Sequence, residues 1–378
     1  MQFRDLKKQY EVLKTDIDAG IAEVINSTSF ISGKAVVQLE EKLADYVGVK
    51  HCITCANGTD ALSLALMAWG VGQGDCVFVP NFTFFASAET VMSRGAIPIF
   101  VDVDKQTFNM DASKLEAAIE KVLHEGTLTP KVIVTVDLFG LPANYDEIKR
   151  VSEKYNLLIL EDAAQGFGGE YKGKRACSFG NIATTSFFPA KPLGCYGDGG
   201  AIFTDDDKIA ELLRSLRIHG KGTDKYDNVR IGVNSRLDTM QAAILLVKFK
   251  AFVEYELDAV NKAAQKYTNL LKDIVITPFI PHNCKSSWAQ YCIMLDSETE
   301  RDELVQYLKG KDIPTMVYYP KTMSEQRAFD DIVGFSQDLE ISLELCKVIL
   351  ALPMHPYLED ADIEYIAGQI RDWKSSKK

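Results

Sequence analysis

One lysine, Lys191, lies in a turn between two runs of sequence with the composition of buried strands. Ile182–Phe188 is rich in β-branched and aromatic residues, and Gly199–Phe203 begins a second such run. The residues between them exclude a helix and require a close, irregular backbone; they are Pro189, Pro192, Gly194, Gly197, Gly199 and Gly200. A lysine in such a turn is most often a solvated surface residue, so Lys191 alone does not indicate a chemical role.

A second signal is the carboxylate of Asp162 at the end of the apolar run Leu157–Leu160. The run indicates a buried parallel strand, and the carboxyl ends of such strands form the edge where open α/β sheets bind ligands. Asp162 could instead cap the next helix, although Gly166, Gly168 and Gly169 make a helix there less favourable. Together, an amine in a turn and a carboxylate at a strand end form the pair that pyridoxal phosphate requires. The amine forms a Schiff base, and the carboxylate keeps the pyridinium nitrogen protonated.

A phosphate site is one interpretation of Asn57–Asp60, which opens a helix at Ala61. Asn57 is a favourable N-cap, and Gly58 and Thr59 offer backbone N–H groups and a hydroxyl at the positive end of the helix. An anion at that position is both hydrogen-bonded and favoured by the helix dipole. A capped helix without any ligand explains the same residues equally well.

Aromatic residues fill the loop Asn81–Phe85, where polar residues are usual. Burial in the core is one explanation. The other is a ring, Phe84, that stacks on a planar cofactor.

These candidates are spaced along an alternation of strands and helices, which predicts an α/β fold with a largely parallel sheet and helices on both faces. The predicted strands before residue 165 are His51–Ala56, Val77–Pro80, Ile97–Val103, Lys131–Leu138 and the run that ends at Asp162. The predicted helices are 7–25, 34–47, Ala61–Trp69, Ala86–Arg94, Ala112–His124, Tyr145–Tyr155 and a long one from Thr239 to about Asp258.

Near residue 255 the composition changes, so we expect two domains, a large one over 1–254 with an N-terminal helical segment and a small one over 255–378. The small domain should be an α/β unit. Its predicted strands are Trp288–Leu295 and Pro314–Tyr319, and its predicted helices are Glu300–Lys309 and Ala361–Trp373.

The composition excludes some classes of function. The chain has 378 residues, 47% of them hydrophobic, which predicts a globular protein. Its net charge of −11 argues against a nucleic-acid or membrane partner. We expect no signal peptide in the N-terminal residues, and no apolar run approaches the ~20 residues that span a bilayer. Cys52 and Cys55 would lie on opposite faces of a strand, so we expect no metal site and a reduced, cytoplasmic protein. A dinucleotide fingerprint is missing, which sets aside an NAD-dependent oxidoreductase.

Five motifs of the chain, in their order along the sequence, resemble those of the sugar aminotransferases of the DegT/DnrJ/EryC1/StrS group. This group is a branch of the fold-type-I pyridoxal-phosphate enzymes. The resemblance extends from about Phe3 to Trp373. It implies a large domain with a mostly parallel seven-stranded sheet and a smaller C-terminal α/β domain. The motifs are Asn57–Leu62, Phe82–Phe84, Glu161–Gln165, Ser186–Lys191 and Asn234–Asp238.

The resemblance implies catalytic and ring-binding roles. Lys191 would hold pyridoxal phosphate as a Schiff base and later act as general acid and base. Asp162 would pair with the pyridine nitrogen, Gln165 would lie near the ring hydroxyl, and Phe84 would stack on the ring.

The resemblance also implies that Gly58, Thr59 and Ser186 bind the phosphate. Asn234 would join them from the other subunit of a homodimer with shared active sites. Some relatives carry histidine in place of the lysine and perform dehydration, so Lys191 favours transamination from glutamate to a keto-sugar.

For the substrate, three runs look most like the subgroup that aminates C3 of UDP-2-acetamido-2-deoxy-3-oxo-glucuronate for surface polysaccharides, including lipopolysaccharide. They are Lys191–Gly200, Val233–Leu245 and Leu352–Leu358. Arg236 would contact carboxylates there.

Two residues leave alternatives open, and a further alternative is disfavoured. Tyr318 stands where members of that subgroup can have histidine, which leaves a neutral 3-keto or 4-keto sugar linked to dTDP or UDP as the alternative. His219 would either line the substrate side or make a structural hydrogen bond. A non-catalytic relative with a regulatory role is disfavoured because Lys191 and Asp162 are both present.

Overall fold

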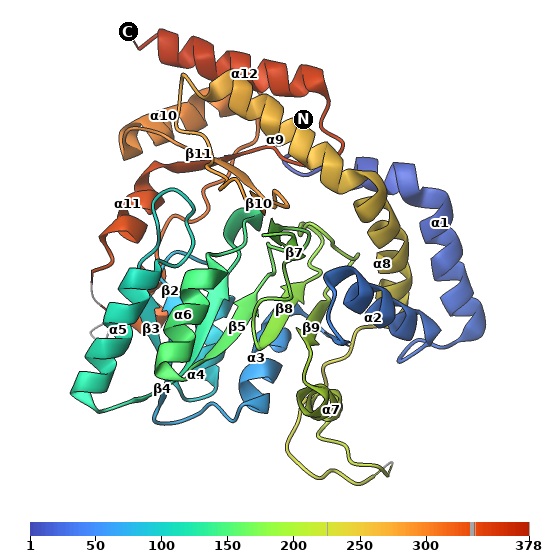
Figure 1. Cartoon of the computed structure of the whole chain (residues 1–378). Coiled ribbons are helices and arrows are strands. Elements are labelled where there is room, and N and C mark those ends of the chain that lie inside the picture. The colour runs from blue at the N-terminus through green and yellow to red at the C-terminus, as the bar shows by residue number, and fades with distance from the viewer. Residues whose placement is uncertain (225, 333–335, 337, 378) are drawn as a thin grey trace.

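The centre of the molecule is a seven-stranded sheet in the order β1-β9-β8-β5-β4-β2-β3 (Figure 1). This computed structural model describes residues 1–378 except 225, 333–335, 337 and 378. β9 is antiparallel to both its neighbours, and the other pairs are parallel. The expected α/β fold with a large, mostly parallel sheet is therefore confirmed. The strands are β1 (His51–Cys55), β2 (Asp75–Pro80), β3 (Ile97–Val101), β4 (Thr129–Val136), β5 (Leu158–Asp162), β8 (Ile182–Ser186) and β9 (Gly200–Thr204).

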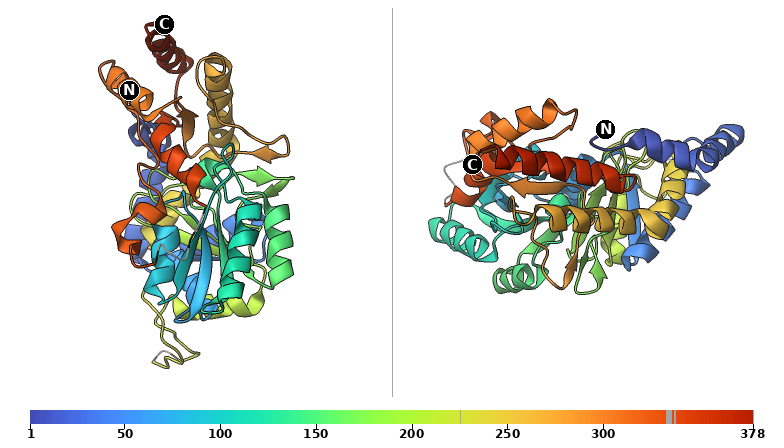
Figure 2. Two further views of the ribbon diagram at one scale, coloured as in Figure 1. Left: turned by 90° about the vertical axis from the view of Figure 1, so that its left-hand side faces the viewer. Right: turned by 90° about the horizontal axis from the view of Figure 1, so that it is seen from above.

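Helices cover both faces of this sheet (Figures 1 and 2). Strand side chains alternate between faces, so Val77 and Val79 enter one core while Phe78 enters the other. One face is covered by α3 (Gly58–Ala68), α4 (Ala86–Ser93) and α7 (Asp207–Leu216). The other is covered by α2 (Lys34–Val47), α5 (Ala112–Glu125), α6 (Tyr145–Tyr155) and α8 (Thr239–Ala251). The N-terminal helix α1 (Leu6–Ser27) packs against α8.

A separate core lies in the C-terminal part, at the top of Figure 1. Its two-stranded sheet joins β11 (Tyr291–Met294) to β12 (Ile349–Leu352). The helices that contribute to this core are α9 (Leu257–Leu271), α10 (Glu298–Lys309) and α12 (Asp360–Ser375), whereas α11 (Glu340–Val348) packs into a core of the large sheet. A π-helical turn, η2 (Phe252–Glu256), connects α8 to α9 without a break. We propose this turn as the boundary between the two domains. In the described residues, no helix combines the length and the apolar character needed to cross a membrane.

The remaining strands and short helices lie outside the two sheets described above. β10 (Cys284–Lys285) pairs with β6 (Glu170–Tyr171), which pairs with β7 (Lys174–Arg175). The 3₁₀ turns are η1 (Leu138–Gly140), η3 (Met323–Glu325) and η4 (Arg327–Phe329).

The prediction of a strand over Pro314–Tyr319 is wrong. Only Met316 pairs with β12, through an isolated bridge to Ala351. Pro314 has no N–H to donate to a ladder, and beyond the bridge the chain turns toward the large domain, where the Tyr319 hydroxyl accepts a hydrogen bond from Gln165 Nε2 (2.9 Å). The strand that does pair with β11 is β12, an apolar run that the sequence interpretation did not identify.

Candidate active site

The structure brings Lys191 and Asp162 together at the carboxyl edge of the sheet. Asp162 ends β5, and Lys191 lies in the turn after the neighbouring strand β8. The Lys191 backbone N–H donates to the Phe188 carbonyl (2.8 Å), which closes the turn. Burial lowers the pKa of the Lys191 amine; the Asp162 carboxylate opposes this shift, and the Arg4 guanidinium adds to it. The amine and the carboxylate are therefore close enough to act on each other.

Asp162 is held by two donors. Ser87 Oγ donates to Oδ2 (2.8 Å), and the Ala164 N–H donates to Oδ1 (3.2 Å). Burial raises the pKa of Asp162, and these two hydrogen bonds and the Lys191 charge limit the rise. A carboxylate fixed in this way at a strand end is suited to hold a protonated ring nitrogen. Ser87, on α4, was not identified from the sequence.

The residues expected to bind a phosphate also lie together. Asn57 Oδ1 accepts from the Asp60 N–H (2.7 Å), so α3 is capped as predicted. The first N–H groups of a helix, here those of Gly58 and Thr59, have no partner within it. Ser186 lies against them, because a Cβ added to Gly58 would be 2.7 Å from the Ser186 Cβ. A helix end and a hydroxyl thus converge on one point, which fits a phosphate group.

Gln165 is buried, and both ends of its amide are occupied. Its Oε1 accepts from the Phe139 N–H (2.7 Å), and its Nε2 donates to the Tyr319 hydroxyl (2.9 Å). Phe84 is 54% exposed, whereas Phe82 is 1% exposed. Core burial therefore explains Phe82 but not Phe84, whose ring lies 6.4 Å from that of Tyr319, between centroids.

Tyr319, which the sequence interpretation did not single out, is the tyrosine that contacts Gln165. The predicted Tyr318 makes edge contacts with Phe3 and Tyr319, at 6.3 and 5.8 Å between ring centroids. Two adjacent tyrosines were visible in the sequence, but their directions follow from the path of the chain after the bridge at Met316.

The remaining predicted site residues lie on a segment after α7 that extends away from the body of the molecule, at the bottom of Figure 1. His219 and Asn234 are exposed, and Arg236 is half-buried. The His219 N–H donates to the Val233 carbonyl (2.8 Å), so its backbone helps to close the base of the segment. Ser235 Oγ accepts from the Ala56 N–H (3.0 Å), which places that base beside the start of α3.

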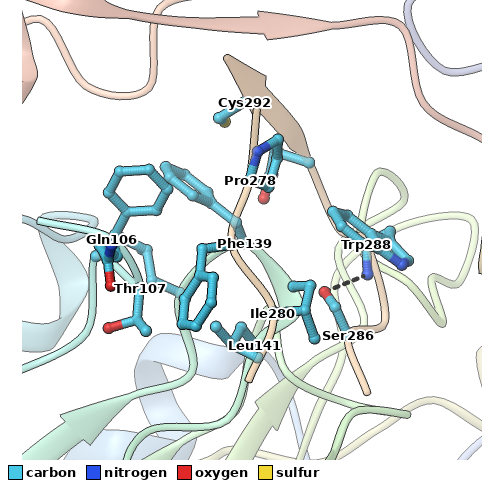
Figure 3. A pocket seen from close by; sticks show the side chains of 13 residues that line it. Gln106, Thr107, Phe139, Leu141, Pro278, Ile280, Ser286, Trp288 and Cys292 are labelled. Carbon is cyan, nitrogen blue, oxygen red and sulfur yellow. Dashed lines mark hydrogen bonds between the residues drawn. The ribbon is translucent and has the colours of Figure 1, made fainter. Parts of the chain in front are cut away.

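A small apolar cavity of about 20 Å³ lies between the two domains (Figure 3). Phe139, whose N–H binds Gln165, forms one wall, and Trp288 and Cys292 lie on the other side. This volume holds about one water molecule, so the cavity is not a substrate site.

Comparison with known proteins assigns the family. Residues 11–371 match the DegT/DnrJ/EryC1/StrS aminotransferase family. The chain belongs to this family. Its fold agrees with a crystal structure of a family aminotransferase from Brucella abortus, with a TM-score of 0.96 and 47% identity over 99% of both chains.

Two characterised relatives match nearly the whole chain. One, from Pseudomonas aeruginosa, is a UDP-2-acetamido-2-deoxy-3-oxo-D-glucuronate aminotransferase, 46% identical over 98% of this chain and 99% of the relative. The other, from Geobacillus stearothermophilus, is a pleiotropic regulatory protein, 41% identical over 98% of this chain and 97% of the relative. The expected family is thus confirmed.

Proposed function

We propose that this protein is a pyridoxal-phosphate-dependent aminotransferase that moves an amino group from glutamate to a keto group, at C3, of a nucleotide-linked sugar. The observation that carries the proposal is the pairing of Lys191 with Asp162 beside the capped end of α3, in a chain of this aminotransferase family. The aminotransferases of the family use pyridoxal phosphate, and the described residues fit that group.

When bound, pyridoxal phosphate supplies an aldehyde and an electron-accepting ring. Lys191 would supply the amine that holds the group and would move the proton at the substrate carbon. Because the site lowers the pKa of Lys191, a larger fraction of the amine is neutral and nucleophilic near pH 7. Asp162 holds the proton on the ring nitrogen, and Ser87 keeps its carboxylate oriented.

The other contacts position the group. The N–H groups of Gly58 and Thr59 and the Ser186 hydroxyl would bind the phosphate. The exposed ring of Phe84 would stack on the cofactor. Gln165, fixed by its bonds to Phe139 and Tyr319, would lie near the ring hydroxyl.

The proposed substrate is UDP-2-acetamido-2-deoxy-3-oxo-glucuronate, the substrate named for the 46% identical relative. Arg236 would bind its carboxylate, with His219 and Tyr318 on the substrate side. The product would serve surface polysaccharide synthesis in the cytoplasm. A neutral 3-keto or 4-keto nucleotide sugar is the alternative, because Tyr318 adds no cation.

A homodimer with shared sites completes the proposal, with Asn234 reaching the phosphate of the partner's site. Its support is the segment after α7, which exposes apolar side chains to solvent: Ile231 is 88% and Val229 is 52% exposed. Mixing two inactive homodimers, Lys191→Ala and Asn234→Asp, should restore activity, because each mixed dimer contains one intact site. A mixture that stays inactive after confirmed subunit exchange would argue against shared sites.

The central test follows the absorbance of the purified protein with pyridoxal phosphate. A visible band should appear, fall on addition of glutamate and return on addition of the keto-sugar that is the substrate. Lys191→Ala should abolish the band, whereas the exposed Lys208→Ala should not. Comparing the uronate with 3-keto-UDP-N-acetylglucosamine, whose sugar carries no carboxylate, separates the two substrate classes.

A regulatory role without catalysis is the second candidate, favoured by the 41% identical regulatory relative. A protein that takes up no pyridoxal phosphate would favour it over the aminotransferase.

A further inference from the structure

The N-terminal segment Phe3–Gln9 touches the Lys191 turn, the connection between the domains and the small domain. Arg4 Nη2 donates to the Lys191 carbonyl (2.7 Å). The Phe3 carbonyl accepts from the Met354 N–H (3.2 Å). Gln9 Nε2 donates to Glu256 Oε1 (2.8 Å) in η2. The segment therefore fixes the Lys191 turn relative to the small domain and to the connection between the domains.

Arg4 lines a cavity of about 10 Å³ with Pro192, Glu256, Trp288 and Pro356. A space of this size holds no more than a water molecule, so no sugar can reach Arg4 through it. Among the described residues, no carboxylate lies within ion-pair distance of Arg4. Burial lowers its pKa to about 10, so it stays positively charged near pH 7.

We propose that Arg4 is a positioning residue for Lys191, which fixes the backbone of the catalytic turn and disfavours a second positive charge on the lysine amine. This proposal rests on the role of Lys191 in the proposed function. The hydrogen bond to the Lys191 carbonyl supplies the first effect, and the charge of Arg4 supplies the second.

The charges around the amine agree with this direction. Burial and Arg4 both lower the pKa of Lys191, and Asp162 on β5 raises it. Electrostatic interactions with Glu256 and Tyr318 raise the pKa of Arg4. The charge of Arg4 in turn lowers the pKa of Lys248 and that of His355. Arg4 is thus the cation that acts on Lys191 from the N-terminal segment.

The test compares Arg4→Met, Arg4→Gln and Arg4→Lys in the holoenzyme, with the exposed Lys7→Met as the matched control. The pH at which the absorbance of the bound cofactor changes should rise by roughly one unit in Arg4→Met and Arg4→Gln, the size of a neighbouring-charge effect. It should stay near the wild-type value in Arg4→Lys and Lys7→Met. If Arg4→Met does not fold, Arg4→Gln tests the same shift, because its amide can still donate to the Lys191 carbonyl.

A second readout is the rate at which the apoprotein takes up pyridoxal phosphate. Near pH 7 this rate should fall about tenfold in the neutral variants, because the neutral fraction of the amine falls with a one-unit shift. The proposal would be overturned if the absorbance of the bound cofactor changed at the same pH in wild type and Arg4→Gln. It would also be overturned if this pH shifted equally in Arg4→Lys and Arg4→Met. A wild-type protein with no cofactor band would instead overturn the proposed function.

Discussion

A buried pair of carboxyl groups behind the active-site acid gives the sharpest prediction. Asp137 and Glu161 are both 0% exposed, and the Asp137 N–H donates to the Asp162 carbonyl (3.1 Å). Glu161 accepts backbone N–H groups from Phe179 (2.7 Å), Gly180 (3.0 Å) and Cys177. Burial raises the pKa of Glu161 to about 7, and its three backbone donors limit that rise, so Glu161 is the member of the pair that ionises first.

Asp137 is in the opposite situation. Its Oδ1 accepts from the Ala143 N–H (3.0 Å) and the Tyr145 hydroxyl (2.8 Å), while Oδ2 has no partner among the described groups. Burial, followed by the charge of Glu161, raises the pKa of Asp137 well above its usual range. We infer that Oδ2 carries a proton that it donates to Glu161.

Replacing Asp137 by Asn should therefore be tolerated, because the amide keeps the oxygen acceptor and supplies a fixed donor. In the wild type, the pKa of Asp137 is higher in the folded state than in the unfolded state, where it is about 3.9. The free energy of unfolding therefore falls as the pH rises above about 3.9. The loss continues until the pH passes the folded pKa, at about 1.36 kcal/mol per unit. Between pH 6 and 8 the wild type should lose up to about 2.7 kcal/mol that Asp137→Asn does not lose.

Glu161→Gln provides the contrast. A glutamine there turns an N–H donor toward other N–H donors, so at least one buried group loses its partner. The expected loss is about 2–5 kcal/mol at every pH. Denaturant unfolding at pH 6, 7 and 8 measures both effects, with the exposed Glu211→Gln as control. The same pH dependence in Asp137→Asn and the wild type would refute the assignment of the proton, and so would a Glu161→Gln protein as stable as Asp137→Asn.

Three further outcomes are expected. Ser87→Ala removes a donor to Asp162, so kcat for transamination should fall roughly tenfold, for a loss of about 1–2 kcal/mol. Gly58→Ala should weaken cofactor binding in equilibrium dialysis, because the new Cβ would lie 2.7 Å from a side chain of β8, whereas Gly368→Ala has open space and should not. Lys248 is 2% exposed and burial lowers its pKa to about 8, so Lys248→Met should raise the unfolding free energy by up to about 3 kcal/mol below pH 8, a gain that disappears near pH 10.

The part of the site that lies at the ends of strands could be predicted from the sequence. Asp162 and Lys191 could be placed together because carboxyl ends of neighbouring parallel strands meet at one edge. The cap at Asn57 is a local signal and was also predictable. The two explanations of the aromatic loop could not be separated, because only the path of the backbone shows that Phe82 points into the core and Phe84 out of it.

The supporting residues were not predictable in the same way. Arg4, Ser87 and Tyr319 come from an N-terminal segment, a helix and the small domain, and they meet the site only through tertiary packing. The failed strand at Pro314–Tyr319 has the same origin. Its composition favours a strand, but the contact of Tyr319 with Gln165 takes the chain away from the sheet.

These distant residues lower the pKa of both catalytic groups, which has opposite effects on the two charges. Asp162 has to keep its charge in a buried position, and Ser87 and Ala164 donate to it and limit the rise of its pKa. Lys191 has to lose its charge, and burial together with Arg4 lowers its pKa. A single apolar environment would neutralise both groups, so the acid needs donors of its own, and Arg4 offsets the Asp162 charge that favours the protonated amine. Losing Ser87 should therefore raise the pKa of the acid, and losing Arg4 that of the amine, so each variant impairs a different half of the same pair.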